Sequence, residues 1–368
     1  MQRAALIASE TLWAGGHPPD HPLRPERLRD TWEMLHAYRA FEGSHTQIVP
    51  PRMATFEELA TVHTERYLDA VRRLSNGDHT VKGSRFGFGS GDNPVFSGMW
   101  ESEGLKVGAA LVGAELLLCG AADVVFSFAG GLHHAGRNYA SGFCVFGDGA
   151  AAIHKLVAAG WRVAYIDIDA HHGDGVQNAF YEDDRVLTIS FHESGRYLFP
   201  GTGFTRDLGR GRGEGYSVNV PLQPYTDDAV FLWAFEQVVP PLVERFQPDV
   251  VVAQLGVDAH WRDPLTHLAL TTHGLEALFK GIQQLGYPWL AVGGGGYDRR
   301  VVPRAWTLAW GVMSKQTFDD QLPAAVADGH DPPLLRDEAT VMMPSQVREE
   351  IMAATIATVK ELKAALKF

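Results

Sequence analysis

Residues 165–175 hold the densest set of side chains in the sequence that could bind a metal ion. The segment reads YIDIDAHHGDG, with acids and histidines close together. Because extended residues alternate faces, Asp167, Asp169 and, if the strand continues that far, His171 point the same way. Carboxylates and an imidazole that converge at a strand end cost free energy unless a cation compensates them. The alternative, a loop whose acids only cap backbone amides, suits a lone Asp-x-Asp better than a run this dense.

A further acid completes a possible metal site. Asp258 follows an apolar run at residues 250–257, where a predicted strand ends. Asp169, His171 and Asp258 together would supply the three protein ligands of an open catalytic zinc site. Taken alone, Asp258 would also suit a turn or a helix cap.

Two adjacent histidines, His133 and His134, follow an apolar run through a pair of glycines. Histidine titrates near neutral pH, so two of them beside a metal could share the work of base and acid. Each would need a carboxylate to fix its tautomer, and Asp167 and Asp174 are the acids that the metal leaves unassigned. Which acid pairs with which histidine stays open at this point, and a structural role for the two histidines is the alternative.

Four glycines at residues 293–296 lead into Tyr297. They follow a predicted strand, so the backbone can turn tightly beside the possible metal site. The tyrosine hydroxyl could donate a hydrogen bond to an oxyanion, a role worth about 3 kcal/mol in other enzymes. A phosphate-binding loop is the competing interpretation, but the segment lacks the Lys-Ser/Thr pair and the G-x-G-x-x-G spacing of such loops.

The elements that must position these residues are indicated by alternating apolar patterns. Val- and Ile-rich runs predict buried strands at residues 122–128, 163–168, 186–191, 250–257 and 289–292. Helical periodicity predicts helices at residues 103–119, 149–159, 227–246 and 272–285. This alternation favours an α/β fold around a parallel sheet, in which ligands bind beyond the carboxyl ends of the strands. Residues 321–344 read as an irregular surface segment, and residues 345–368 as a terminal helix packed on the domain rather than a partner-binding helix.

The composition argues against a nucleic-acid-binding protein, a membrane protein and a disulfide-rich protein. The 368 residues carry 32 Lys and Arg against 44 Asp and Glu, a net charge of −12, which argues against direct binding to nucleic acid or anionic membranes. No apolar run approaches the roughly 20 residues that span a bilayer, and the N-terminus does not read as a secretory signal. Only Cys119 and Cys144 are present, so disulfides do not form the framework of the fold. We expect a cytoplasmic protein.

In combination, these motifs resemble the zinc-dependent histone deacetylase family of the arginase/deacetylase superfamily. The matching segments keep a consistent order: GGLHHA at 130–135, SGFC at 141–144, DIDAHHGDG at 167–175, FPGTG at 199–203, QLGVD at 254–258 and GGGGY at 293–297. The GGLHH form resembles the class I-like and bacterial AcuC-like branch. The resemblance implies a single α/β domain of the arginase/deacetylase type over residues 1–368, with an eight-stranded parallel sheet flanked by helices. Its core would end near residue 315, with an irregular segment and a helix over 316–368.

The resemblance also implies a role for each site residue. The zinc ligands would be Asp169, His171 and Asp258, and the catalytic residues would be His133, His134, Tyr297, Asp167 and Asp174. Asp167 would orient His133, and Asp174 would orient His134. The substrate-binding residues would be Asp92, Gly142, Phe143, Phe199, Leu265 and Gly295. A structural K⁺ would lie near Asp167, Asp169, His171, Ser190 and Phe191.

The activity implied by the resemblance is zinc-dependent hydrolysis of an N-acyl amide. The substrate would be N6-acetyl-lysine in proteins or peptides, and the products acetate and a free amine. Acetylpolyamines or other small acyl-amines are the alternative substrates, and a non-catalytic acyl-lysine binding module is a remote alternative. One Zn²⁺ per chain is expected, with Fe²⁺ as the other candidate metal. The oligomeric state stays open.

Two features of the sequence separate it from related proteins. The dimanganese ureohydrolases need an acid two residues after His171 and another two residues after Asp258, where this chain has Gly173 and His260. One metal is therefore expected rather than two. His260 and Trp261 also replace the smaller residues usual after the last ligand, and they would either reshape the mouth of the site or only pack at its rim.

Overall fold

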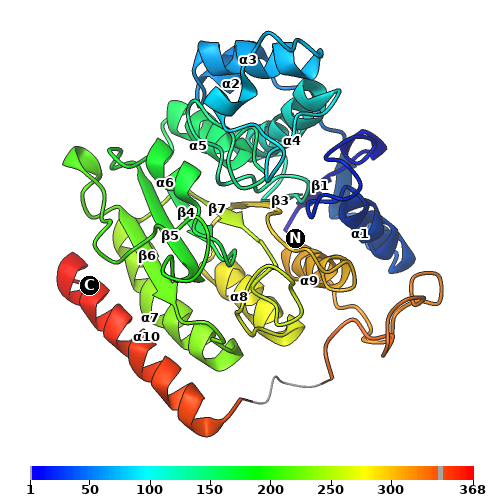
Figure 1. Ribbon diagram of the computed structural model, residues 1–368. Helices are drawn as coiled ribbons and strands as arrows, with labels where there is room; N and C mark the ends of the chain where they lie inside the picture. The colour runs from blue at the N-terminus through cyan, green and yellow to red at the C-terminus, as the bar shows by residue number, and fades with distance from the viewer. Residues whose placement is uncertain (1, 339–342) are drawn as a thin grey trace.

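The computed structural model describes residues 2–338 and 343–368 (Figure 1). Within this part of the chain, eight strands form one sheet in the order β2-β1-β3-β8-β7-β4-β5-β6. Every neighbouring pair in the sheet is parallel. The strands are β1 (Ala4–Ile7), β2 (Thr46–Val49), β3 (Val124–Ser127), β4 (Val163–Asp167), β5 (Val186–Glu193), β6 (Ser217–Leu222), β7 (Val250–Gln254) and β8 (Trp289–Val292). The expected α/β fold with an eight-stranded parallel sheet is confirmed.

Helices cover both faces of the sheet, so the strands between them are apolar and buried. One face carries α4 (Met99–Leu118) and α5 (Asp148–Ala158), with α2 (Phe56–Ala60) and α3 (Glu65–Ser75) outside them and α6 (Asp174–Ala179) against α5. The other face carries α7 (Asp228–Phe246), α8 (Thr272–Gln284) and α9 (Val302–Ser314). Outside these lie α1 (Glu26–Ala37) against α9 and α10 (Ser345–Leu366) along α7.

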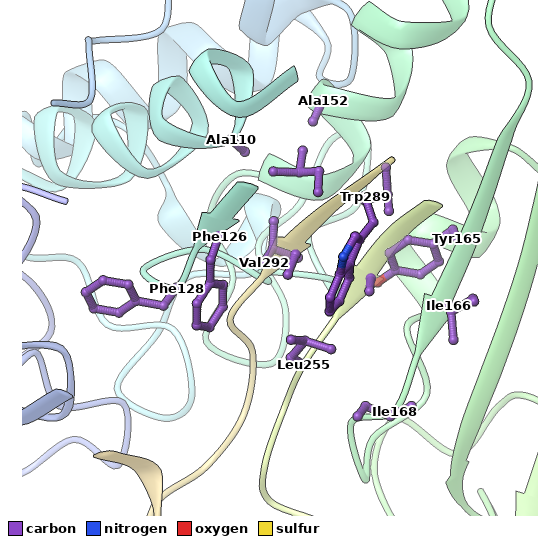
Figure 2. Packing of buried hydrophobic residues seen from close by; sticks show 14 of the residues in the cluster. Ala110, Phe126, Phe128, Ala152, Tyr165, Ile166, Ile168, Leu255, Trp289 and Val292 are labelled. Atoms are coloured by element: carbon purple, nitrogen blue, oxygen red, sulfur yellow. The ribbon is translucent and has the colours of Figure 1, made fainter. Parts of the chain in front are cut away.

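The core lies between the central strands and the helices on each face (Figure 2). Trp289 of β8 and Tyr165 of β4 are both fully buried on central strands of the sheet. Ala110 of α4 and Ala152 of α5 face the strands, and small residues there let the helices approach closely.

The local patterns predict the central strands, most helices packed on the sheet and the outer helix α10, but they miss α9 and several outer elements. Five strands and α4, α5, α7 and α8 lie within a few residues of their predicted positions. Three strands are missed: β1 is half alanine, β2 is a short edge strand with exposed residues, and β6 has Ser217, Asn219 and Pro221 between its apolar residues. The C-terminal helix α10 buries Ile351, Val359 and Leu362. Over the described ranges, no helix combines the length and apolar character needed to cross a bilayer.

Four neighbouring strands bring distant segments of the chain to one edge of the sheet. The order β3-β8-β7-β4 places the loops after Ser127, Val292, Gln254 and Asp167 side by side. Because all four strands are parallel, these loops leave from the same edge. The chemistry-bearing residues of the sequence lie on them.

His63 connects the loop after α2 to this edge. Its Nδ1 lies 3.0 Å from the carbonyl oxygen of Gly136, and its Nε2 accepts the N–H of Gly147 at 3.1 Å. The proton therefore resides on Nδ1, and a second proton would have to face the Gly147 N–H. Burial lowers the pKa of His63 from 6.5 to about 4.

We expect the free energy of unfolding to fall between pH 6.5 and pH 4 because of His63. In this range the unfolded chain binds a proton at His63 that the folded chain does not, so acid favours unfolding. One such proton corresponds to a slope of at most about 1.4 kcal/mol per pH unit. Denaturant unfolding of a His63→Gln variant at several pH values should show a shallower dependence than the wild type. The exposed His79, changed to Gln, is the control and should leave the slope unchanged. Parallel curves for wild type and His63→Gln would rule out this role.

Candidate active site

Three buried side chains bring their ligand atoms together at the carboxyl edge of the sheet. Oxygens of Asp169 and Asp258 and a ring nitrogen of His171 all lie within 4.8 Å of one another. We call these three residues the donor cluster. Two of them follow β4 and the third follows β7, the adjacent strand. The sequence prediction that two separate loops meet here agrees with this geometry.

Asp169 is oriented by donors from its own loop and from two other segments. Its Oδ2 accepts hydrogen bonds from the Gln254 side-chain amide and from the Gly295 N–H, each at 2.7 Å. Its Oδ1 accepts the N–H of His171 at 2.9 Å. A Cβ on Gly295 would collide with the Asp258 carboxylate, so only glycine fits this close approach.

Asp258 is positioned by contacts with two residues in the loop after β4. Its Oδ1 accepts the N–H of Ala170 at 2.8 Å, and its Oδ2 lies 2.9 Å from Nδ1 of His171. Burial, followed by the charge of Asp169, raises the pKa of Asp258 to about 6. Two carboxylates are thus confined where their negative charges repel each other.

His133 and His134, which we call the histidine pair, lie beside the donor cluster with ring centroids 4.1 Å apart. Nδ1 of His133 lies 2.8 Å from Oδ2 of Asp167, and Nδ1 of His134 lies 2.7 Å from Oδ1 of Asp174. Nε2 of His133 lies 3.8 Å from Oδ1 of Asp169. The structure therefore has the histidine–carboxylate pairing that the family resemblance implies.

The two histidines differ in their electrostatic environment. Burial alone would lower the pKa of His133, but the charges of Asp167 and Asp169 raise it to about 9. Burial and the neighbouring His133 lower the pKa of His134 to about 4, although Asp174 opposes this. The two pKa shifts are opposite in direction, and His134, whose pKa is lowered, is the member that stays neutral at neutral pH and can accept a proton.

Aromatic rings flank this arrangement. The ring of Tyr297 lies 5.7 Å from that of Phe143 in an edge-on contact, and its backbone N–H donates to Oδ2 of Asp263 at 2.8 Å. Burial raises the pKa of Tyr297 well above its usual range, so its hydroxyl stays protonated. Phe199 is 42% exposed and packs edge-on against His134 at 5.1 Å.

The other predicted substrate-binding residues differ in how exposed they are and in which residues they contact. Gly142 has a φ of 50°, and a Cβ there would collide with the ring of His134. Leu265 is partly exposed, and its N–H donates to Asp263 at 3.0 Å. Asp92 is exposed, and its carbonyl oxygen lies 3.0 Å from Nε2 of His21.

Of the residues predicted to surround a K⁺, Asp167 ends β4, Asp169 and His171 lie in the loop after it, and Ser190 and Phe191 lie on β5. Asp167 is opposite Ser190 in the sheet, and Phe191 follows in the same strand. Ser190 Oγ lies 2.9 Å from Nδ1 of His192. Asp167 also accepts the Tyr165 hydroxyl at 2.8 Å.

Two buried charged residues that support the site were missed by the sequence reasoning. Arg27 of α1 donates to the carbonyl oxygen of Gly294 at 2.6 Å and so holds the glycine loop before Tyr297. Asp148 accepts the N–H groups of Gly131 and Leu132 and holds the turn before the histidine pair. The only available signal for Asp148 was its place at a predicted helix start, and nothing local marks Arg27.

Comparisons with known proteins agree with this geometry. Residues 21–313 match the histone deacetylase domain. The chain is 45% identical over 320 residues to the acetoin utilization protein AcuC of Bacillus subtilis, covering 84% of this chain and 82% of the relative. It is 39% identical over 305 residues to the histone deacetylase RPD3 of Saccharomyces cerevisiae, covering 82% and 70%. A crystal structure of an HDAC homolog complexed with SAHA superposes with a TM-score of 0.88 at 30% identity, covering 96% of this chain and 100% of that one. An HDAC homolog from Aquifex aeolicus superposes with a TM-score of 0.85 at 30% identity and the same coverage. The chain therefore belongs to the histone deacetylase family, and it is a deacetylase hydrolase.

Proposed function

We propose that this deacetylase uses one Zn²⁺ per chain to hydrolyse N6-acetyl-lysine amides in proteins or peptides. The observation that carries the proposal is the donor cluster lying beside two carboxylate-paired histidines. Family membership supports the deacetylation chemistry, and the likeness to a yeast histone deacetylase supports an acetyl-lysine substrate.

The donor cluster suits zinc by its chemistry. An imidazole nitrogen and two carboxylate oxygens are ligands that catalytic zinc sites use, and Fe²⁺ accepts the same donors. The raised pKa of Asp258 points the same way, because a divalent cation would compensate two carboxylates that otherwise repel each other. When bound, zinc supplies Lewis acidity that activates a water molecule and polarises the amide carbonyl.

The histidine pair would carry out the proton transfers of the reaction. His134, neutral at neutral pH, accepts a proton from the attacking water as the water oxygen bonds to the acyl carbon. The same proton then passes to the amine nitrogen as the carbon–nitrogen bond breaks, which leaves acetate and a free amine. Asp174 keeps Nδ1 of His134 paired so that Nε2 does this work, and Asp167 holds Nδ1 of the neighbouring His133 in the same way.

The remaining residues would bind the acyl-lysine. The Tyr297 hydroxyl donates a hydrogen bond to the carbonyl oxygen as that oxygen gains negative charge. Phe143, Phe199 and Gly142 flank the apolar methylene stem. Asp92, exposed at the rim, would accept an N–H from the substrate backbone. Leu265 and Gly295 complete the substrate-binding set.

A structural K⁺ is part of the same proposal. The side chains of Asp167 and Ser190 and the backbone of Asp169, His171 and Phe191 would hold it. The sheet register that pairs Asp167 with Ser190 supports this assignment. The ion would add a positive charge behind the His133–Asp167 pair.

Acetylpolyamines are the second candidate substrates, favoured by the net charge of −12, which attracts cationic amines. Zinc-loaded protein should be assayed on an acetyl-lysine peptide and on acetylspermidine. We expect kcat/KM to be at least about tenfold higher on the peptide, a difference of about 1.4 kcal/mol in transition-state binding. The reverse preference would overturn the peptide substrate, and acetate release from neither compound would overturn the proposed function.

Tyr297→Phe should lower kcat about 100-fold, because the loss of one oxyanion donor costs about 10²–10³ in rate. Zinc content, measured by elemental analysis, should not change. Tyr38→Phe is the control, since that hydroxyl bonds to the carbonyl oxygen of Asp319 away from the site. Full turnover in Tyr297→Phe would refute the oxyanion role.

Gly295→Ala should weaken zinc binding by about tenfold or more, the range seen when groups that support metal ligands are changed. The added methyl group would push against the carboxylate of Asp258. A competition titration with a chromophoric chelator measures the affinity. Gly149→Ala in α5 is the matched control, because a Cβ there meets nothing within 4 Å. Equal zinc affinity in the two variants would contradict the proposed ligand geometry.

A further inference from the structure

Asp337 lies at the centre of a hydrogen-bond network outside the region matched by the family domain. Its carboxylate accepts bonds from Nη2 of Arg304 at 2.6 Å, from the backbone N–H of Thr272 at 3.0 Å, and pairs with Nε2 of His260 at 2.8 Å. The side chain of Asp337 is 10% exposed. It thus joins the irregular C-terminal segment to the start of α8, to α9 and to the loop after β7.

The tautomer of His260 is fixed so that its Nε2 proton faces Asp337. Its Nδ1 accepts the N–H of Arg262 at 3.2 Å, so the ring proton on Nε2 is the one that faces Asp337. The imidazole is fully buried. Burial would raise the pKa of Asp337, but the hydrogen bond from His260 and further donors lower it, so its carboxylate is ionised.

The loop that His260 anchors includes Asp258 and contacts Tyr297 through Asp263. Asp258 precedes His260 by two residues, and Thr266 donates to the Asp258 carbonyl oxygen at 2.5 Å. The carbonyl oxygen of His260 accepts the N–H of Asp263, and Asp263 in turn accepts the backbone N–H of Tyr297 at 2.8 Å. A shift of His260 would therefore reach both the donor cluster and Tyr297.

We propose that Asp337 is a positioning residue that acts through His260 to hold the 258–266 loop, and with it Asp258 and Tyr297, in the geometry that the reaction needs. The inference rests on the proposed metal centre. It gives the C-terminal segment a part in the active site, although this segment supplies no ligand to the donor cluster.

The chain offers a matched control in a second ion pair between the same segment and α8. Glu276 accepts two bonds from Arg336, at 2.7 and 3.0 Å, and its side chain is 11% exposed. Its bonded partners do not include the 258–266 loop. Glu276→Gln therefore weakens the attachment of the segment without touching His260.

Asp337→Asn should weaken zinc affinity about tenfold and lower kcat at saturating zinc about tenfold, the lower end of the effects seen for residues behind metal ligands. KM should change less than twofold. In chelator-treated protein, hydrogen exchange should become faster in peptides covering residues 257–266. Glu276→Gln should leave all of these readouts near wild type. Wild-type zinc binding and turnover, measured alongside, test the proposed metal centre separately.

A second set of variants separates positioning from general stability. The double variant Asp337→Asn/His260→Ala should lose no more zinc affinity than His260→Ala alone, because Asp337 acts through His260. His260→Gln, whose amide can still donate toward Asp337, should retain more affinity than His260→Ala. This comparison decides the question even if Asp337→Asn does not fold. Additive losses, equal affinities for the two His260 variants, or losses in Glu276→Gln as large as those in Asp337→Asn would overturn the proposal.

Discussion

The rest of the site depends on the confinement of two carboxylates and an imidazole in a buried volume. Asp169 and Asp258 repel each other there, and burial removes the water that would otherwise screen them. Backbone N–H groups of His171, Ala170 and Gly295 and the Gln254 amide are directed at their oxygens. These donors hold the carboxylates in place, while a divalent cation would supply the positive charge that the cluster lacks.

The parallel sheet makes this confinement possible. The four strands β3, β8, β7 and β4 are neighbours, so their following loops share one edge although they are far apart in sequence. The histidine pair comes from the first of these loops, Tyr297 from the second, Asp258 from the third, and Asp169 and His171 from the fourth. The charge of Asp169, which would face a cation, also raises the pKa of His133, whereas burial and the neighbouring His133 lower the pKa of His134. Metal binding and proton transfer are therefore coupled through one electrostatic environment.

Much of this arrangement could be predicted, because the reacting groups lie directly after apolar strands. Asp169 and His171 follow β4 closely, and their dense run of acids and histidines indicated convergence, although the strand ends at Asp167 and its alternation does not extend to them. The number of strands came from the family resemblance, since the alanine-rich β1, the exposed edge strand β2 and the polar β6 give no clear local pattern. The supporting residues could not be predicted. Arg27 bonds to a loop 267 positions away, and Asp337 lies in a segment with no periodicity, so no local signal connects either residue to the site.

The most direct test of the central claim is anomalous X-ray scattering at the zinc absorption edge from crystals of the zinc-loaded protein. We predict one anomalous peak per chain, between the carboxylates of Asp169 and Asp258 and the ring of His171. Two neighbouring peaks at this position would indicate a dinuclear centre. That result, or a single peak away from these three side chains, would contradict the account.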